Sequence, residues 1–463
     1  MGKSGELIKN TAIISIGKMG TQVVNFLLLP LYTAKLTTEA YGNFDYVTTI
    51  ALFLVPLMTM LMEESMFRFL IDSRTDEEKK IIISHTFLFC FASGFITSLI
   101  IGGASWIFNY SLGYSILIYC VSSLFIALSN ALARGTGRIG LYSLSNFYVS
   151  ITIILLNLIL ILGFHQGFYA LMASACVANV AAALFVLTKL KFWSYIDIKN
   201  YKSSTTKKML AYSIPLVPNT ISWSVINASD RLVIMNFLGA SANGLYSIAY
   251  KFPNLISTFY NFFNIAWRET SAKIVRDNDT NEFKKIYKMV KAAILAVTIL
   301  LIAVIRYVYP LFINVQYHES VVYVPILAIS IYYTSLSAFY GGVFSAYKET
   351  KILGTTSTYA AIINLAVDLA LFKFIGLYAA AISTLASSLF LYLYRKYRMK
   401  KFFNAYEKND AGILTVFVAL LILFYINNQA LNVVAVIIAL LVSVLFNFHT
   451  ICVIVKRLEK RVR

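Results

Sequence analysis

Polar and basic side chains recur at the spacing of one helix face inside several apolar stretches of this chain. In residues 11–34 the polar positions are three or four apart; they are Thr11, Ser15, Lys18, Gln22 and Asn25. Residues with that spacing lie along one face of an α-helix. Such side chains are costly in lipid, so the face is expected to contact protein or a water-filled cavity. These residue types offer hydrogen bonding and charge pairing, for helix contacts or for a ligand.

Two further stretches have polar residues at the same helical spacing. In residues 210–238 they are Thr220, Ser224, Asn227 and Arg231. In residues 244–267 they are Lys251, Asn254, Thr258 and Asn261. The alternative for the amides and hydroxyls is helix–helix contact, and Asp230 could simply neutralise Arg231. We predict that the substrate-binding residues are Lys18, Gln22, Asn25, Ser224, Asn227, Arg231, Lys251 and Asn254. The candidates for a coupling proton or sodium ion are the buried acids Asp230, Glu63, Glu64 and Asp368.

Motifs for enzyme chemistry are missing from the sequence. The four histidines, His85, His165, His318 and His449, are scattered, and there is no H-E-x-x-H, no G-x-S-x-G and no phosphate-cradling glycine loop with lysine. The four cysteines show no paired spacing. We therefore predict a protein that is not an enzyme, with no cofactor and no metal.

The elements that position these residues are membrane helices. Hydrophobic residues make up 59% of the 463 positions and charged residues 13%, whereas a soluble domain is about 45–50% apolar and about 25% charged. About 20 apolar residues are needed to cross a bilayer as a helix. We predict fourteen transmembrane helices, at 11–34, 42–69, 81–108, 114–133, 142–163, 168–187, 210–238, 244–267, 287–311, 321–346, 354–374, 377–393, 413–426 and 431–455.

The positive charges fix an orientation for these helices. With the N-terminus inside, 34 of the 40 lysines and arginines lie in inner segments and three lie in outer gaps: Lys35, Arg306 and Lys373. Cytoplasmic loops carry such an excess, so both termini are predicted to be cytoplasmic. The net charge of +19 is spread over loops that face anionic headgroups. It is not gathered on one face, so we expect no nucleic-acid partner.

The chain also contains an internal duplication. The segment LTTEAYGNFDYV from Leu36 matches LGASANGLYSIAY from Leu238, which places Gly42 and Gly244 at equivalent turns. A second pair, LLNLILILGFHQGFYALMAS from Leu155 and IINLAVDLALFKFIGLYAAAIS from Ile362, follows in the same order. Biased apolar helices match by chance, but two ordered matches favour two parallel six-helix lobes around a central cavity. The same offset of 202 places Asn25 on Asn227, so the first helix of each lobe is expected to line that cavity.

The predicted fold is therefore an all-α integral membrane protein. Its parts are an N-terminal six-helix lobe at 1–189, a basic cytoplasmic linker at 190–209, a C-terminal six-helix lobe at 210–397, and two additional helices with a basic tail at 398–463.

The run SIPLVPNTISWSVINASDRLVIMNFLGASANGLYSIAYKF from Ser213, and LLLPLYTAKLTTEAYGNFDYV from Leu27, resemble the polysaccharide flippases of the multidrug/oligosaccharidyl-lipid/polysaccharide exporter superfamily. The resemblance implies a transporter that flips an isoprenoid-diphosphate-linked oligosaccharide to the outer leaflet by alternating access. It implies that Lys18, Arg231 and Lys251 meet the diphosphate. It also implies a monomer in the bacterial plasma membrane that works with a polysaccharide polymerase and other assembly proteins.

Three other interpretations remain open at this level. The first is a peptidoglycan-precursor flippase, and the second is a drug/cation antiporter of the same superfamily, which typically has twelve helices and an acidic cavity. The third is a scaffold, or an enzyme of lipid-linked glycan assembly, for which a large outer loop is expected. The longest predicted outer gap, near residues 310–319, is too short to form a domain.

Overall fold

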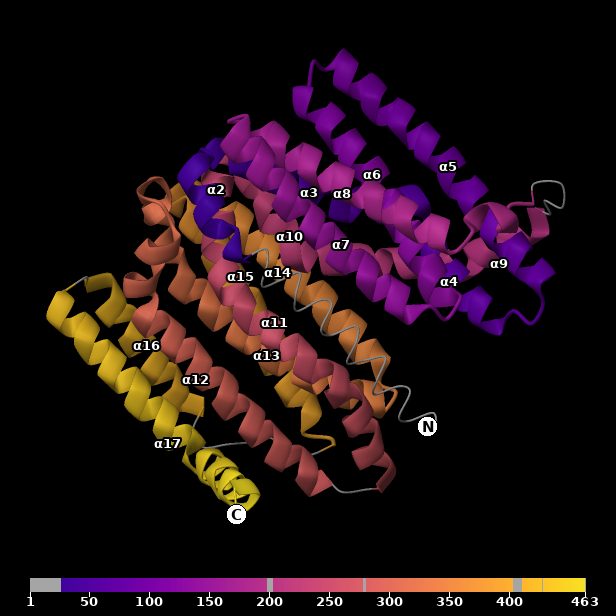
Figure 1. Ribbon diagram of the computed structural model, residues 1–463. Coiled ribbons are helices and arrows are strands. Elements are labelled where there is room, and N and C mark those ends of the chain that lie inside the picture. The colour runs from indigo at the N-terminus through magenta and orange to yellow at the C-terminus, as the bar shows by residue number, and fades with distance from the viewer. Residues whose placement is uncertain (1–25, 198–202, 278–279, 403–409, 427, 463) are drawn as a thin grey trace. The chain divides into compact units, whose positions relative to one another are not determined.

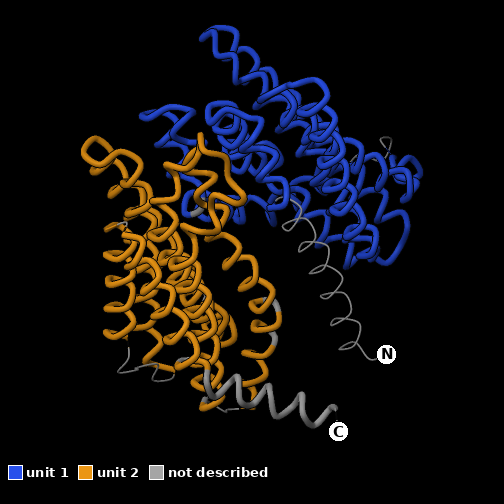
Figure 2. Tube along the Cα trace, turned by 60° about the vertical axis from the view of Figure 1, so that its left-hand side comes forward, with its two compact units in different colours: residues 1–244 blue, residues 245–463 orange. Residues whose placement is uncertain are grey.

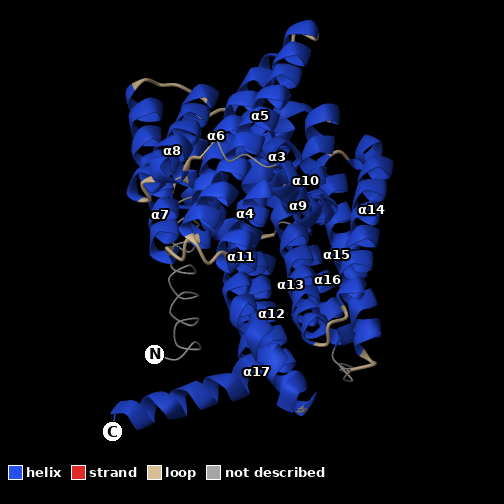
Figure 3. Ribbon diagram, turned by 90° about the vertical axis from the view of Figure 1, so that its right-hand side faces the viewer, coloured by secondary structure: helices blue, strands red, loops and turns tan. Residues whose placement is uncertain are grey.

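The computed structural model describes every residue except 1–25, 198–202, 278–279, 403–409, 427 and 463 (Figure 1). The chain divides into two compact units, residues 1–244 and 245–463 (Figure 2). Throughout the described residues the regular elements are helices, with no strand (Figure 3). This confirms the predicted all-α class. The four-part division into lobes, linker and added helices stays a prediction.

The first unit contains the described helices of the predicted N-terminal lobe and continues to residue 244. In chain order they are α2 (Leu29–Lys35), α3 (Thr38–Thr59), α4 (Met62–Asp72), α5 (Asp76–Ile107), α6 (Ser111–Gly135), α7 (Ile139–Asn157), the π-helix η1 (Leu158–Gly163), α8 (Phe168–Lys189), η2 (Phe192–Tyr195), α9 (Ser203–Ser213), η3 (Ile214–Leu216), α10 (Val217–Phe237) and the start of α11 (Gly239–Asp277).

The second unit contains the rest of α11 and the C-terminal helices. These are α12 (Thr280–Phe312), the 3₁₀ segment η4 (Val315–Tyr323), α13 (Val324–Ala346), α14 (Thr350–Ile375), α15 (Leu377–Met399), α16 (Asp410–Ile426) and α17 (Gln429–Val462).

The helices have the length and surface of membrane spans. Among the described residues, eight are long and apolar enough to cross a bilayer, or nine if α3 and α4 form one bent span. Helix α5 leaves Phe95, Leu99 and Ile100 largely exposed, as expected for side chains that face lipid. The chain is thus a multi-span membrane protein. The count of fourteen stays a prediction, and most of its first span lies outside the described residues.

The predicted span at 42–69 is broken in the structure. Helices α3 and α4 meet at a bend of 54°, where Met60 and Leu61 have φ angles of 48° and 52°. The Thr59 hydroxyl accepts a 3.2 Å hydrogen bond from the Leu61 N–H and so satisfies one backbone donor at the break. Residues with a side chain rarely adopt this left-handed conformation, and no glycine marks the site in the sequence.

The basic connection at 190–209 is anchored on both sides of residues 198–202. Before them, the Ser84 hydroxyl of α5 donates to the Tyr195 carbonyl (3.1 Å) and accepts from the Asp197 N–H (2.7 Å). After them, the Ser65 hydroxyl of α4 donates to the Met209 carbonyl of α9 at 3.0 Å. Both ends of the connection are therefore fastened to the first unit.

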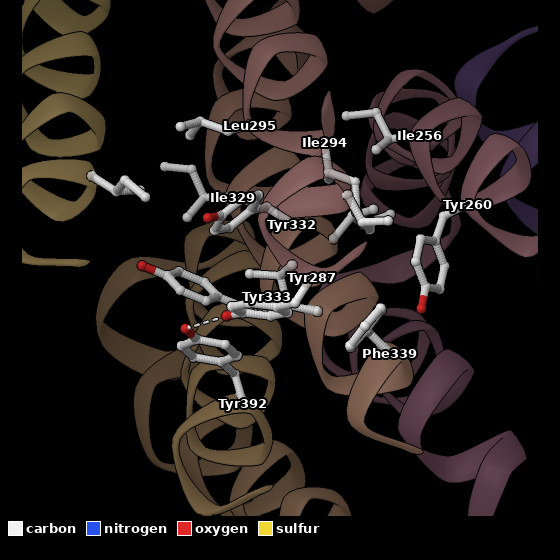
Figure 4. Packing of buried hydrophobic residues seen from close by; sticks show 14 of the residues in the cluster. Ile256, Tyr260, Tyr287, Ile294, Leu295, Ile329, Tyr332, Tyr333, Phe339 and Tyr392 are labelled. Atoms are coloured by element: carbon white, nitrogen blue, oxygen red, sulfur yellow. Dashed lines mark hydrogen bonds between the residues drawn. The ribbon is translucent and has the colours of Figure 1, made fainter. Parts of the chain in front are cut away.

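The second unit has a core rich in aromatic side chains. Trp267 of α11 is buried and donates its indole N–H to the Phe339 carbonyl of α13 at 2.9 Å. A methyl group on Gly342 would come within 2.6 Å of the Trp267 ring, so this glycine permits the close packing. Tyr287 of α12 and Tyr392 of α15 share a 3.1 Å hydroxyl–hydroxyl hydrogen bond (Figure 4).

One arginine that the charge count assigned to an inner loop lies inside this core. Arg395 is 2% exposed and donates hydrogen bonds to the Ser337 carbonyl of α13 and to the Thr356 and Ser357 hydroxyls of α14, at 3.0–3.1 Å. Helix α15 continues to Met399, so Arg395 belongs to the helix, and its side chain points into the helix bundle. Arg395 thus links three helices.

Candidate functional site

Helices α3 and α10 pack together in the first unit, and a charge pair joins them. The Arg231 Nε lies 3.0 Å from the Asp45 Oδ2, and the two side chains are 14% and 13% exposed. Burying an ion pair costs solvation free energy that the attraction only partly returns. The energy of the pair alone therefore does not explain why these two charges are kept at mostly buried positions. This favours a functional role for the pair.

Two more predicted residues of α10 are placed by hydrogen bonds. The Ser224 hydroxyl donates to the Leu52 carbonyl of α3 at 3.1 Å, so this serine joins two helices. The carboxylate of Asp230 is buried and accepts a 3.0 Å bond from the backbone N–H of Arg231. The ion pair of the Arg231 side chain is with Asp45, a partner that the sequence analysis did not consider.

The other predicted substrate residues are only partly placed. Lys251 and Asn254 lie half-buried on α11 in the second unit, one turn apart. Asn227 lies on α10, and its side chain is outside what the structure describes. Lys18, Gln22 and Asn25 all lie outside the described residues. The structure therefore joins Ser224 and Arg231 to α3, and the single cavity for all eight residues stays a prediction.

The four acidic candidates lie on three helices. Glu63 is buried in the first turn of α4, directly after the break, while its neighbour Glu64 pairs with Arg134 of α6 at 3.6 Å. Asp230 is on α10. Asp368 is buried on α14 of the second unit, one turn after the buried Asn364. Among the described residues no three His, Cys, Asp or Glu side chains come together as a metal site, so these acids are separate candidates.

The two matched turns of the duplication contact each other within the first unit. A methyl group on Gly42 would lie 1.8 Å from the Ala240 carbonyl oxygen, and one on Gly244 would lie 2.0 Å from the Thr38 carbonyl oxygen. The Asn243 amide donates to the Gly42 carbonyl at 2.8 Å. The hydroxyls of Thr38 and Ser241 are 2.5 Å apart. Only glycine at both positions lets the two backbones approach so closely.

Sequence reasoning missed Asp45, although it lies three residues after Gly42 in the matched segment. The available signal was a carboxylate near the start of a predicted apolar span, because an acid there needs a basic partner or a water-filled surrounding. The bulk of α3 is apolar, which made that carboxylate the residue to pair with Arg231.

Comparisons with known proteins agree with this architecture. The family model for polysaccharide biosynthesis proteins matches residues 7–267, more than half of the chain. An uncharacterized membrane protein of Methanocaldococcus jannaschii is 23% identical over 84% of this chain and 96% of its own length.

Two solved structures share the fold. A lipid II flippase, MurJ, in an inward closed conformation, has a TM-score of 0.69 at 16% identity, covering 96% of this chain and 100% of its own. An inward-facing multidrug resistance MATE family transporter of the MOP superfamily has a TM-score of 0.66 at 14% identity, covering 82% and 95%. The chain belongs to the polysaccharide biosynthesis protein family, and it shares its fold with these two membrane transport proteins.

Proposed function

We propose that this protein is a transporter of the multidrug/oligosaccharidyl-lipid/polysaccharide exporter superfamily, and that it flips an isoprenoid-diphosphate-linked oligosaccharide from the inner to the outer leaflet of the bacterial plasma membrane, for cell-surface polysaccharide synthesis. The observation that carries the proposal is Arg231, a mostly buried guanidinium on α10 that is paired with Asp45 of α3. An arginine presents a planar, permanently charged group that matches phosphate oxygens. Membership of the polysaccharide biosynthesis family supports the sugar-linked substrate class.

Asp45 gives the proposed site a resting state. While no substrate is bound, the Asp45 carboxylate neutralises the Arg231 guanidinium. A diphosphate that binds replaces this one carboxylate with two negatively charged phosphate groups. Charge-assisted hydrogen bonds of this kind contribute about 1.5–3 kcal/mol each. Lys251 of α11, with Lys18, is proposed to supply the remaining positive charge, and Gln22, Asn25, Asn227 and Asn254 are proposed to contact the sugars or the diphosphate.

Alternating access is the proposed cycle. The contact between the turns at Gly42 and Gly244 lies at the end of the helices that the charge distribution assigns to the outside, so it is a candidate for the closed outer gate. Coupling to a proton or to sodium is proposed to act through the buried acids Asp230, Glu63, Glu64 and Asp368. The polymerase and other assembly proteins are proposed partners.

A pair of variants separates substrate binding from folding. Arg231→Ala leaves Asp45 buried without its partner, whereas Asp45→Asn combined with Arg231→Gln keeps a neutral polar pair of similar size. Both are expected to lower transport at least tenfold, since about 1.4 kcal/mol is a factor of ten, and Arg231→Lys is expected to retain part of it. Arg68→Ala is the matched control, because Arg68 is half-exposed and pairs within its own helix with Asp72.

The measurement is surface polysaccharide, together with the lipid-linked precursor that accumulates in cells at matched protein level. Normal polysaccharide in the neutral double variant would show that the guanidinium serves packing alone. Accumulation of peptidoglycan precursor instead would identify the alternative flippase activity, and an effect on drug resistance only would identify the antiporter.

A further inference from the structure

Helix α16 covers a cavity in the second unit that the transport proposal does not use. It has a volume of about 270 Å³ and lies among α13, α15 and α16. Its walls are aromatic and aliphatic, with Tyr332, Tyr333 and Tyr392 on one side. At its mouth, Leu393 and Leu414 are 53% and 51% exposed. In a membrane protein, exposed leucines at this position face lipid, so the cavity opens toward acyl chains.

One end of the cavity is charged. Asp410, the first residue of α16, accepts hydrogen bonds from Lys396 of α15 and, at 2.5 Å, from Lys291 of α12. The Tyr392 hydroxyl also lies 3.4 Å from the Asp410 carboxylate. Lys291 is buried, and the Lys396 side chain is 16% exposed, so Lys396 is the cation that an incoming group reaches first.

Polarity changes steadily along the cavity. Asp410, with Lys396 paired to it, marks the end that is predicted to face the cytoplasm, and Leu393, Ile413 and Leu414 lie about one turn deeper. Leu389 is seven residues from Lys396, which is roughly 10 Å along the helix. A phospholipid of the inner leaflet has the same order of groups, a phosphate at the interface and an acyl chain below it.

The basic residues at this end outnumber the acid. Beyond Lys396, the helix end carries Arg398, Lys400 and Lys401, all exposed, and Lys401 lies 3.5 Å from Glu349. Basic residues next to the inner interface attract anionic lipids. A soluble anion would gain nothing from the apolar walls, because a cavity that holds water or ions needs several polar partners.

We propose that this cavity binds an anionic phospholipid of the inner leaflet, with an acyl chain between Tyr333, Leu393 and Leu414 and the phosphate at Lys396. The tyrosine cluster forms the floor, since the rings of Tyr333 and Tyr392 lie 5.3 Å apart and the Tyr392 hydroxyl is hydrogen-bonded to that of Tyr287 (Figure 4). The bound lipid fastens α16 to α15. This assignment does not depend on which substrate is transported.

The test uses the full chain purified in detergent, titrated with phosphatidylglycerol or with phosphatidylcholine, with binding read by native mass spectrometry and by the thermal unfolding midpoint. The unsubstituted protein is expected to prefer phosphatidylglycerol. Lys396→Gln is expected to weaken that lipid about fivefold, which is about 1 kcal/mol for one lysine near the surface. Leu414→Trp, which fills the mouth without changing charge, is expected to weaken both lipids.

Lys189→Gln is the control, because Lys189 also lies in the last turn of a helix predicted to end inside, where its side chain is exposed. It should leave both titrations unchanged. Equal binding of the two lipids, or unchanged affinities in Lys396→Gln and Leu414→Trp, would overturn the proposal. So would displacement of phosphatidylglycerol by an equimolar isoprenoid diphosphate, which would assign the cavity to the transported lipid. No transport is measured, so the outcome is independent of the flipping assay.

Discussion

Replacing Gly42 by alanine tests whether the contact between the matched turns is a gate. The added methyl group would lie 1.8 Å from the Ala240 carbonyl oxygen and 2.7 Å from the Gly244 nitrogen. Both are backbone atoms that cannot rotate away, so the two turns must separate by more than about 1 Å. Forcing an extra methyl group into packed structure costs about 1–3 kcal/mol. If the turns part in the alternate state, that cost shifts the equilibrium toward it by about 5-fold to about 150-fold.

The assay is disulfide cross-linking of Thr38→Cys with Ser241→Cys, because the two hydroxyls are 2.5 Å apart. Gly42→Ala is expected to slow cross-linking by at least fivefold at matched protein level. Gly103→Ala is the control, since a methyl group there meets no atom within 4 Å. Thr38→Ala, which removes one hydrogen bond and adds no clash, gives a milder perturbation to be followed by transport. Unchanged cross-linking in Gly42→Ala would refute the close packing on which the gate rests.

Three further predictions follow from the charges. A cysteine that replaces Ser204 is expected to react with a membrane-impermeant reagent only in opened cells. A cysteine that replaces Asn428 is expected to react in intact cells. The reverse pattern would contradict the predicted orientation. Asp45→Asn leaves the guanidinium that it pairs with in a poorly solvated position, so stability should fall by about 3 kcal/mol. An unchanged thermal midpoint would mean that water reaches the pair. Arg395→Ala should lower the midpoint strongly, because each lost charged hydrogen bond contributes about 1.5–3 kcal/mol, whereas the exposed Arg398→Ala should not.

The sequence predicted the helices better than the contacts between them. Apolar length and loop charge are properties of single segments, so the all-α membrane class could be read directly from the sequence. The break at Met60 could not, because two residues with side chains in the left-handed conformation leave no local signal. The partner of Arg231 and the buried position of Arg395 depend on which helices are neighbours. The spacing of polar and apolar residues along a single sequence does not show which helices are neighbours.

The anchors of the basic connection have a consequence for loop length. Ser84 holds the chain before residues 198–202, and Ser65 holds it after them, so each end of the predicted linker has its own anchor. Lengthening it should then cost only loop-closure entropy, about 0.6 kcal/mol for each doubling of length. This stretch is therefore a suitable place for inserting a reporter or an affinity tag into an otherwise tightly packed membrane protein, on the side predicted to face the cytoplasm.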